Sequence, residues 1–272
     1  METRMFFVRH GDSHHKRDGV VGGPEGCRGL TDEGRGQAAL LGRRLAADIA
    51  PRGTAGTRGT GDMARAEPTA GSAAAGGRQG AGGRQGAKGR EGAEGREGAE
   101  GREGKGDVER AGGVRVAIYT SPLPRAVETA AAISAAVGRP AVPDCGLCTW
   151  HTPPEADGLK QVEFLERFGI EGGGLYRPFQ RGNETWAEMV TRTSRTITEL
   201  ADRHRGQSVV LVGHAETVEI SFNALGLMPV YRPFDLMVSP ASITEWSTSE
   251  DPAQWPPPRW TLRRFNVKPE GD

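Results

Sequence analysis

The sequence predicts an α/β protein in which helices cover both faces of a mainly parallel sheet. Short apolar runs typical of buried strands recur along the chain, and stretches with helical periodicity lie between them. Such alternation is typical of parallel sheets that are buried on both faces. The composition also changes sharply near residue 51 and recovers near residue 114, so one segment interrupts the pattern.

Strands are expected at five places. The first, residues 5–8, reads Met-Phe-Phe-Val, and the others occupy 114–119, 208–212, 242–247 and 260–267. The run Ser-Val-Val-Leu-Val at 208–212 is too apolar for an exposed edge. The last two strands are expected to pair with each other and to close the sheet.

Four longer segments have helical periodicity. In the first, Thr31 is a suitable N-cap, and Ala38, Leu41, Leu45 and Ile49 follow at helical spacing. The other helices are expected at 124–137, 184–204 and 216–225. Each helix therefore separates two strands or follows one, which favours parallel connections.

Residues 51–113 form a low-complexity insert of Gly, Ala, Arg and Glu. Glycine stands at every third position from Gly77 to Gly104, which is the collagen period. The repeat contains no proline, so a triple helix is disfavoured, and a disordered segment that buries little apolar surface is expected. Residues 1–50 and 114–272 are expected to form one domain.

Charge and composition exclude several classes of partner. The chain has 272 residues, with 35 basic and 35 acidic side chains and a formal charge of zero. Zero net charge gives no electrostatic reason to expect nucleic acid or a membrane surface. No apolar run approaches the roughly 20 residues of a spanning helix, and no signal-peptide core follows Met1. A cytoplasmic protein is expected.

The three cysteines are too few for a disulfide framework. Cys145 and Cys148 have the C-x-x-C spacing, but no helix is expected to begin there and stabilise a thiolate. His151 and Cys27 are conceivable additional zinc ligands, although no second pair at ligand spacing exists. Ordinary thiols are therefore the prediction, with no metal and no cofactor.

Cationic or imidazole side chains follow each of the three apolar strands. Arg9 and His10 end the first strand, Arg125 lies just beyond the second, and His214 follows the third. The carboxyl ends of parallel strands meet at one edge of a sheet, where ligands bind. Arginine pairs with phosphate through forked, charge-assisted hydrogen bonds. The pattern predicts a phosphate site at this edge.

The motifs at these strand ends resemble those of the histidine phosphatase superfamily, in its phosphoglycerate-mutase-like branch. They are Arg-His-Gly at 9–11, GLTDEGRGQA at 29–38, TSPLPRAVETA at 120–130 and VLVGHAETV at 210–218. The resemblance covers nearly all of the chain outside the insert. It implies a three-layer α/β sandwich, with residues 1–50 and 114–272 as the catalytic domain. It also implies a phosphohistidine at His10, with Arg9, Arg125 and His214 holding the phosphoryl group.

The expected activity is hydrolysis of a phosphate monoester of a small metabolite. A neutral imidazole is a competent nucleophile at phosphorus, and the leaving oxygen needs a proton from a nearby acid. The family often places a carboxylate where this chain has Thr149. Glu155 is the predicted replacement, with Asp157 and then His151 as alternatives. Solvated loop positions are the alternative interpretation of both carboxylates.

Two rival functions stay open. Mutases of this family carry an asparagine six residues after the nucleophile, and Lys16 stands there, which favours a phosphatase over a phosphoglycerate-mutase-type isomerase. A non-catalytic phosphate-binding module is disfavoured because His10, Arg9, Arg125 and His214 are all present. The polar, aromatic stretch 150–181 is expected to cover the site and to select the substrate.

Overall fold

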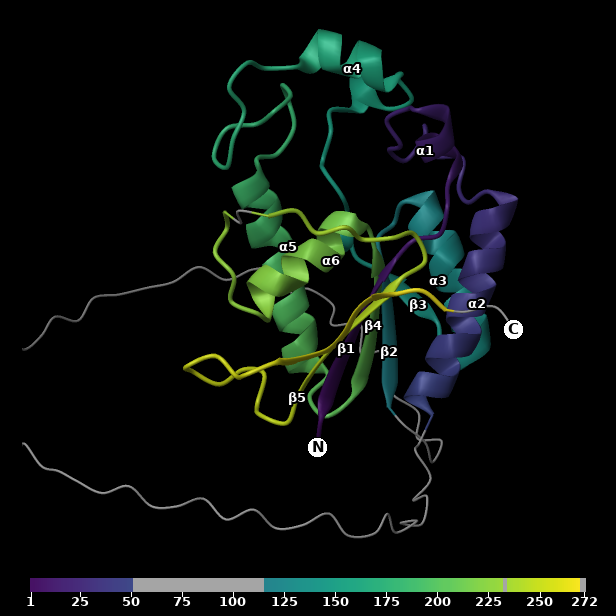
Figure 1. Ribbon diagram of the computed structural model, residues 1–272, viewed down its shortest axis with the longest axis vertical. Helices are drawn as coiled ribbons and strands as arrows, with labels where there is room; N and C mark the ends of the chain where they lie inside the picture. Colours follow the sequence, from purple (N-terminus) through teal and green to yellow (C-terminus); the bar gives the residue numbers. More distant parts are fainter. Residues whose placement is uncertain (51–114, 232–233, 270–272) are drawn as a thin grey trace, which may run out of the picture. The chain divides into compact units, whose positions relative to one another are not determined.

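The structure is a computed structural model, and it describes residues 1–50, 115–231 and 234–269. The predicted insert, 51–113, lies outside the described residues. The described chain forms one α/β unit, shown in Figure 1. No helix in these described ranges is long and apolar enough to cross a membrane.

The sheet has six strands in the order β3-β2-β4-β1-β5-β6. Their bounds are Thr3–Arg9 (β1), Val116–Thr120 (β2), Ala141–Pro143 (β3), Ser208–Gly213 (β4), Ile243–Thr248 (β5) and Thr261–Val267 (β6). Strands β1, β4, β2 and β3 run parallel, each to its neighbour. The register aligns Arg9 with Gly213, so β1 and β4 end side by side.

The expectation of a mainly parallel sheet is wrong, because the sheet is mixed. β5 runs antiparallel to β1, and β6 runs antiparallel to β5. The physical reason is where β5 begins: Ala241 N donates to the carbonyl oxygen of Arg9 at 3.1 Å, at the carboxyl end of β1. From there β5 can only return along β1, from Ile243 beside Val8 to Thr248 beside Thr3.

Six α-helices and two 3₁₀-helices complete the described chain. The α-helices are His14–Asp18 (α1), Asp32–Ile49 (α2), Pro124–Val137 (α3), Gln161–Phe168 (α4), Trp186–Arg203 (α5) and Ala215–Ala224 (α6), and the 3₁₀-helices are Cys145–Leu147 (η1) and Pro154–Ala156 (η2). Thr31 caps α2 as predicted, because its side chain accepts from Gly34 N. Thr185 and Glu188 form a capping box that starts α5.

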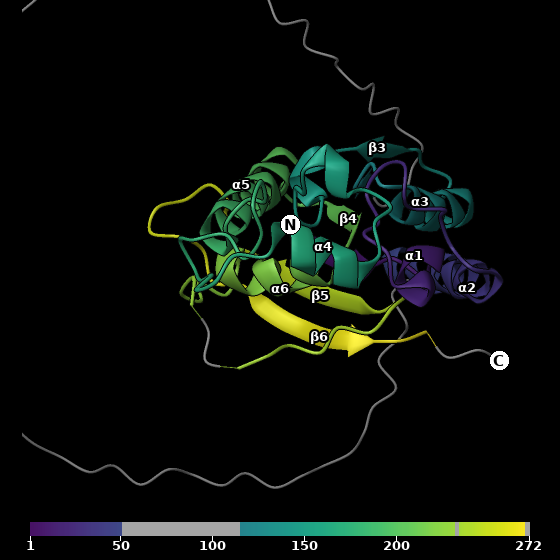
Figure 2. The same cartoon turned by 90° about the horizontal axis from the view of Figure 1, so that it is seen from above.

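Helices cover both faces of the sheet, as Figures 1 and 2 show: α2 and α3 lie on one face, and α5 and α6 on the other. Strand β1 explains how both faces are buried. Phe6 and Val8 belong to the cluster beneath α2 and α3, whereas Met5 and Phe7 belong to the cluster beneath α5 and α6. All four side chains are inaccessible to solvent. Full burial of each contributes about 1.5–3 kcal/mol.

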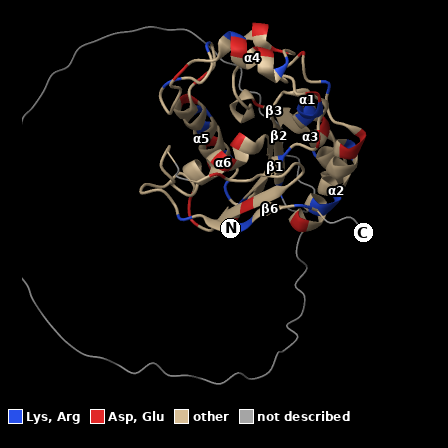
Figure 3. Ribbon diagram, turned by 45° about the horizontal axis from the view of Figure 1, so that its top comes forward, with Lys and Arg blue, Asp and Glu red and all other residues tan. Residues whose placement is uncertain are grey.

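The segments beyond the carboxyl ends of the parallel strands form a cap over this edge. Helices α1 and α4 lie there, above the sheet in Figure 1. Acidic and basic residues both occur along α4 in the ribbon of Figure 3. Within the cap, an antiparallel bridge between Val20, just after α1, and Lys160, just before α4, joins the two segments. The cap leaves room beneath it for the cavities described next.

Candidate active site

The three strand ends meet as the sequence predicts. Arg9 is the last residue of β1, Arg125 is in the first turn of α3 after β2, and His214 is the N-cap of α6 after β4. All three line one cavity of about 320 Å³ together with His10. The parallel register of β1, β4 and β2 produces this meeting, because it aligns the strand ends.

His10 is held in one tautomer by a hydrogen bond at each ring nitrogen. Its ring is buried, and Nδ1 lies 2.7 Å from the carbonyl oxygen of Gly11. A carbonyl oxygen only accepts, so Nδ1 carries the proton and Nε2 carries the lone pair. Consistent with this, Arg125 Nε donates to His10 Nε2 at 3.2 Å. The Nε2 atom of His10 therefore lies beside a guanidinium.

Gly11 is required by a close approach of two backbones. A Cβ at this position would lie 2.6 Å from the carbonyl oxygen of Gly34, at the start of α2. Any larger residue would push β1's end away from α2 and displace His10. Gly11 N also donates to Thr129 Oγ1 at 3.2 Å, which ties the loop to α3. The glycine after the histidine is thus a packing requirement of the site.

Arg9 lines the cavity and has one donor atom without a partner in the described part of the chain. One of its terminal nitrogens donates to the carbonyl oxygen of Val238. Its Nε is buried and has no hydrogen-bond partner among the described residues. Burial lowers the pKa of Arg9, while the carboxylates of Glu216 and Glu219 act in the opposite direction. A buried guanidinium N–H without an acceptor is costly, and a bound anion would satisfy it.

His214 faces His10 from the other side of the cavity. The two rings meet edge to face, with centroids 5.2 Å apart. His214 Nε2 lies 3.0 Å from Ser121 Oγ, and its backbone N–H donates to Thr217 Oγ1 at 3.1 Å. These contacts fix the ring at the end of β4. Together with Arg125, the two imidazoles surround one small volume with nitrogen atoms.

Both imidazoles are neutral at physiological pH. Burial, followed by the charge of Arg125, holds the pKa of His10 well below its usual range. The pKa of His214 is lowered by the same two causes in the same order. Burial also lowers the pKa of His15, which lines the same cavity, to about 4. A neutral His10 is the form that can attack phosphorus.

These pKa shifts predict the pH dependence of activity. Because the folded-state pKa of His10 lies below 6.5, the lone pair predicted to attack phosphorus should be lost to protonation only in more acidic solution. The acid limb of kcat/KM, corrected for the separately titrated phosphate group of the substrate, should therefore fall below pH 6.5. An acid limb at or above pH 6.5 after that correction would contradict the assignment. The measurement is a pH–rate profile at subsaturating substrate.

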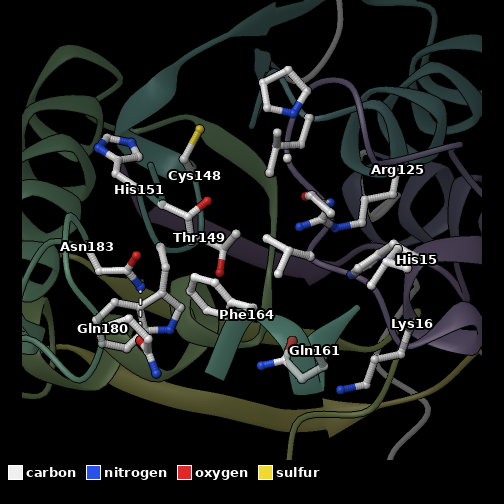
Figure 4. Close-up of a pocket in the computed structure, with 18 of the residues that line it drawn as sticks. His15, Lys16, Arg125, Cys148, Thr149, His151, Gln161, Phe164, Gln180 and Asn183 are labelled. Carbon is white, nitrogen blue, oxygen red and sulfur yellow. Dashed lines mark hydrogen bonds between the residues drawn. The ribbon is translucent and has the colours of Figure 1, made fainter. Parts of the chain in front are cut away.

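A second, larger cavity of about 860 Å³ adjoins the first. His15, Lys16, Arg125 and Thr149 line both cavities, so the two cavities lie side by side. Figure 4 shows Arg125 and His15 on one side of the larger cavity, with Cys148, Thr149 and His151 across from them. The segment predicted to cover the site contributes several lining residues, namely Trp150, His151, Thr152, Gln161, Phe164, Phe179 and Gln180. The larger cavity can hold the organic part of a phosphate ester.

The three candidate proton donors lie in different surroundings. Glu155 is exposed on η2 and lines neither cavity. Asp157 accepts from three backbone N–H groups of the 23–26 loop, at 2.7, 2.7 and 2.9 Å, so it anchors that loop. His151 lines the larger cavity but not the smaller one. Asp157 and Glu155 are therefore not brought to His10 in this arrangement.

The sequence reasoning missed Glu216. This half-buried carboxylate is in the first turn of α6, two residues after His214, and lines the smaller cavity with His10 and Arg9. The signal was available, because the turn after a strand-end histidine points side chains at the same edge. Thr149, which occupies the place of the expected carboxylate, also lines this cavity.

The chain belongs to the histidine phosphatase superfamily (branch 1). The model of that family matches residues 5–80 and 107–263, which is most of the chain. The match confirms the resemblance that the motifs at 9–11, 120–130 and 210–218 indicated. No curated protein matches the sequence.

Solved structures of phosphatases have a similar fold. The mycobacterial glucosyl-3-phosphoglycerate phosphatase is 18% identical, with a TM-score of 0.61 over 98% of this chain and 100% of that one. A mutant phosphoserine phosphatase from Entamoeba histolytica is 15% identical, with a TM-score of 0.57 over 98% of each chain. A mycobacterial hydrolase is 18% identical, with a TM-score of 0.62 over 97% of this chain and 99% of that one. At these identities the likeness shows the fold.

Proposed function

We propose that this protein is a phosphatase that hydrolyses a phosphate monoester of a small metabolite through a phosphohistidine at His10. The observation that carries the proposal is the state of His10: a neutral ring with Nδ1–H bound to Gly11 and Nε2 beside Arg125. The guanidinium of Arg9, which lines the same cavity, adds positive charge for a phosphoryl oxygen.

The reaction proceeds in two displacements. In the first, the lone pair of His10 Nε2 attacks phosphorus, the bond from phosphorus to the ester oxygen breaks, and that oxygen takes a proton. In the second, water attacks the phosphoryl group, loses a proton and releases His10 with inorganic phosphate. Arg9 and Arg125 neutralise the equatorial oxygens, and His214 orients them as a hydrogen-bond donor. Both steps need the same small cavity.

The proton donor is the part of the mechanism where the geometry favours a different residue from the sequence. Glu216 lines the cavity that holds His10, whereas Glu155, the residue predicted from the sequence, is exposed outside it. We therefore propose Glu216 as the acid in the first displacement and the base in the second. Glu155 stays a prediction that the same experiment tests.

Glu216→Gln should slow hydrolysis of an alkyl phosphate by about 10²–10⁴-fold, the usual contribution of a general acid. It should slow p-nitrophenyl phosphate much less, because its phenolate departs with little help. Glu155→Gln is the matched comparison and should leave both rates unchanged. Equal losses on both esters for Glu216→Gln would mean that Glu216 only holds Arg9. A leaving-group-dependent loss in Glu155→Gln alone would restore the sequence prediction.

The substrate is expected to carry a sizeable organic group on its phosphate. Glucosyl-3-phosphoglycerate phosphatase and phosphoserine phosphatase are similar in fold. The cavity of about 860 Å³ beside the phosphate site offers room for such an organic group. Phosphate release should be measured with glucosyl-3-phosphoglycerate, phosphoserine, 2-phosphoglycerate and 3-phosphoglycerate. Interconversion of the two phosphoglycerates without phosphate release would identify a mutase instead.

A further inference from the structure

Two cysteines and a histidine meet on the wall of the larger cavity. Cys145 Sγ lies 3.2 Å from Cys148 Sγ and 3.4 Å from His151 Nε2. All three atoms lie within 4.8 Å of one another, and both cysteines are free thiols. Figure 4 shows Cys148 and His151 near each other on the same side of the cavity. The phosphatase mechanism uses none of these three side chains.

A single 3₁₀ turn brings the two sulfur atoms together. Cys145 begins η1, and Cys148 N donates to the carbonyl oxygen of Cys145 at 3.0 Å. The Asp144 carboxylate accepts from Gly146 N at 2.7 Å and starts the turn. Because the turn is closed by its own hydrogen bonds, the two cysteines are held at this spacing before any ligand binds.

Arg192, on α5, and Glu184, just before α5, stabilise the turn through hydrogen bonds. The Arg192 guanidinium donates to the carbonyl oxygens of Cys145 and Cys148 at 3.1 and 3.3 Å. Glu184 pairs with Arg192 at 2.6 Å and also accepts from the backbone N–H of His151 at 3.0 Å. One ion pair therefore fixes the backbone on both sides of the cluster. Outer contacts of this kind orient the ligands of metal sites.

We propose that Cys145, Cys148 and His151 form a binding site for Zn²⁺. In tetrahedral sites the Zn–S and Zn–N bonds are about 2.3 and 2.0–2.1 Å, which places ligand atoms roughly 3.5–3.8 Å apart. Two of the three separations, 3.2 and 3.4 Å, are close to that spacing, and the third is at most 4.8 Å. Two sulfurs with one imidazole suit zinc. The fourth position is taken by water from the cavity. The proposal does not depend on the proposed phosphatase activity.

Both cysteines are free thiols, and a neutral imidazole offers a nitrogen lone pair, so all three side chains can serve as metal ligands. Binding of Zn²⁺ forms two Zn–S bonds and one Zn–N bond, and both thiol protons leave to solvent.

The side chain of Ser121 lies between the proposed zinc site and the imidazole of His214. Ser121 Oγ lies 3.7 Å from Cys148 Sγ and 3.0 Å from His214 Nε2. A metal on Cys148 would therefore act next to the group that orients the phosphoryl oxygens. This contact distinguishes the cluster from a surface pair of cysteines.

Titration of the full-length chain with Zn²⁺, in a phosphine reductant that keeps the thiols free, tests the proposal. One Zn²⁺ should bind per chain, and Co²⁺ in its place should give thiolate-to-metal charge-transfer bands. Cys145→Ser and His151→Ala, which change exposed residues, should each weaken binding at least about tenfold. Cys27→Ser is the matched control, because Cys27 is outside the cluster, and it should bind as the unchanged chain does.

Two results would overturn the assignment. Absence of stoichiometric Zn²⁺ binding by the folded, reduced chain would remove the site. Binding that persists unchanged in Cys145→Ser would place the metal elsewhere, for example on the imidazoles of His10 and His214. Melting curves of each variant confirm that it is folded, and the Co²⁺ spectrum distinguishes thiolate ligands from imidazoles alone.

Discussion

Replacement of His10 by alanine should lower kcat/KM by on the order of 10³-fold or more, because the attacking atom is removed. The substitution also leaves Arg125 Nε without the acceptor that it has now. The measurement is phosphate release from the best substrate of the panel, followed over a long incubation at high enzyme concentration. Thermal melting of the variant shows whether the buried site has kept its fold.

His204→Ala is the matched control for this substitution. His204 lies between the end of α5 and the start of β4, so it is at the opposite end of the sheet from the cavity. Its Nε2 is 2.9 Å from Tyr119 Oη. Its loss should leave kcat/KM nearly unchanged. If His10→Ala turns over within tenfold of the unchanged chain, His10 is not the nucleophile.

Arg125→Ala should lower kcat/KM by about 10²–10³-fold, the cost of one preorganised donor to a transition-state oxygen. A second effect follows from electrostatics: because the charge of Arg125 lowers the pKa of His10, its removal should raise that pKa. The acid limb of the pH–rate profile should then move to higher pH. A purely structural role of Arg125 would not move that limb.

Arg125→Lys and Arg139→Ala separate charge from geometry. Lysine keeps the positive charge but not the forked donors, so an intermediate loss is expected. Arg139 lies just beyond the other end of α3, away from the cavity, and its loss should have little effect on activity. A loss in Arg125→Ala no larger than in Arg139→Ala would contradict the proposed role.

Much of the site follows from local sequence signals. Arg9, His10 and His214 follow apolar runs, and a buried strand that ends in a cation or an imidazole places it at the ligand edge of a parallel sheet. Thr31 is an N-cap in both the sequence and the structure. These features depend on a few consecutive residues, so one sequence was enough to predict them.

Features that depend on long-range pairing were predicted less well. The antiparallel direction of β5 depends on the edge at which the chain returns to the sheet. The hydrophobic periodicity of the sequence does not predict that edge. Glu216 lines the smaller cavity and Glu155 does not. This difference depends on the path of the chain around the cavity, which the neighbouring residues in the sequence do not indicate. The meeting of His151 with Cys145 likewise depends on Glu184 and Arg192, from a different part of the chain.

The most direct test of the central proposal is to locate the phosphoryl group during turnover. The unchanged chain is mixed with substrate, quenched in alkali within the first turnover, digested and analysed by mass spectrometry. The proposal predicts an acid-labile, base-stable phosphoryl group on the peptide that carries His10, which disappears as substrate is exhausted. A phosphoryl group on a different residue, or steady turnover with no phosphorylated peptide at any time point, would contradict it.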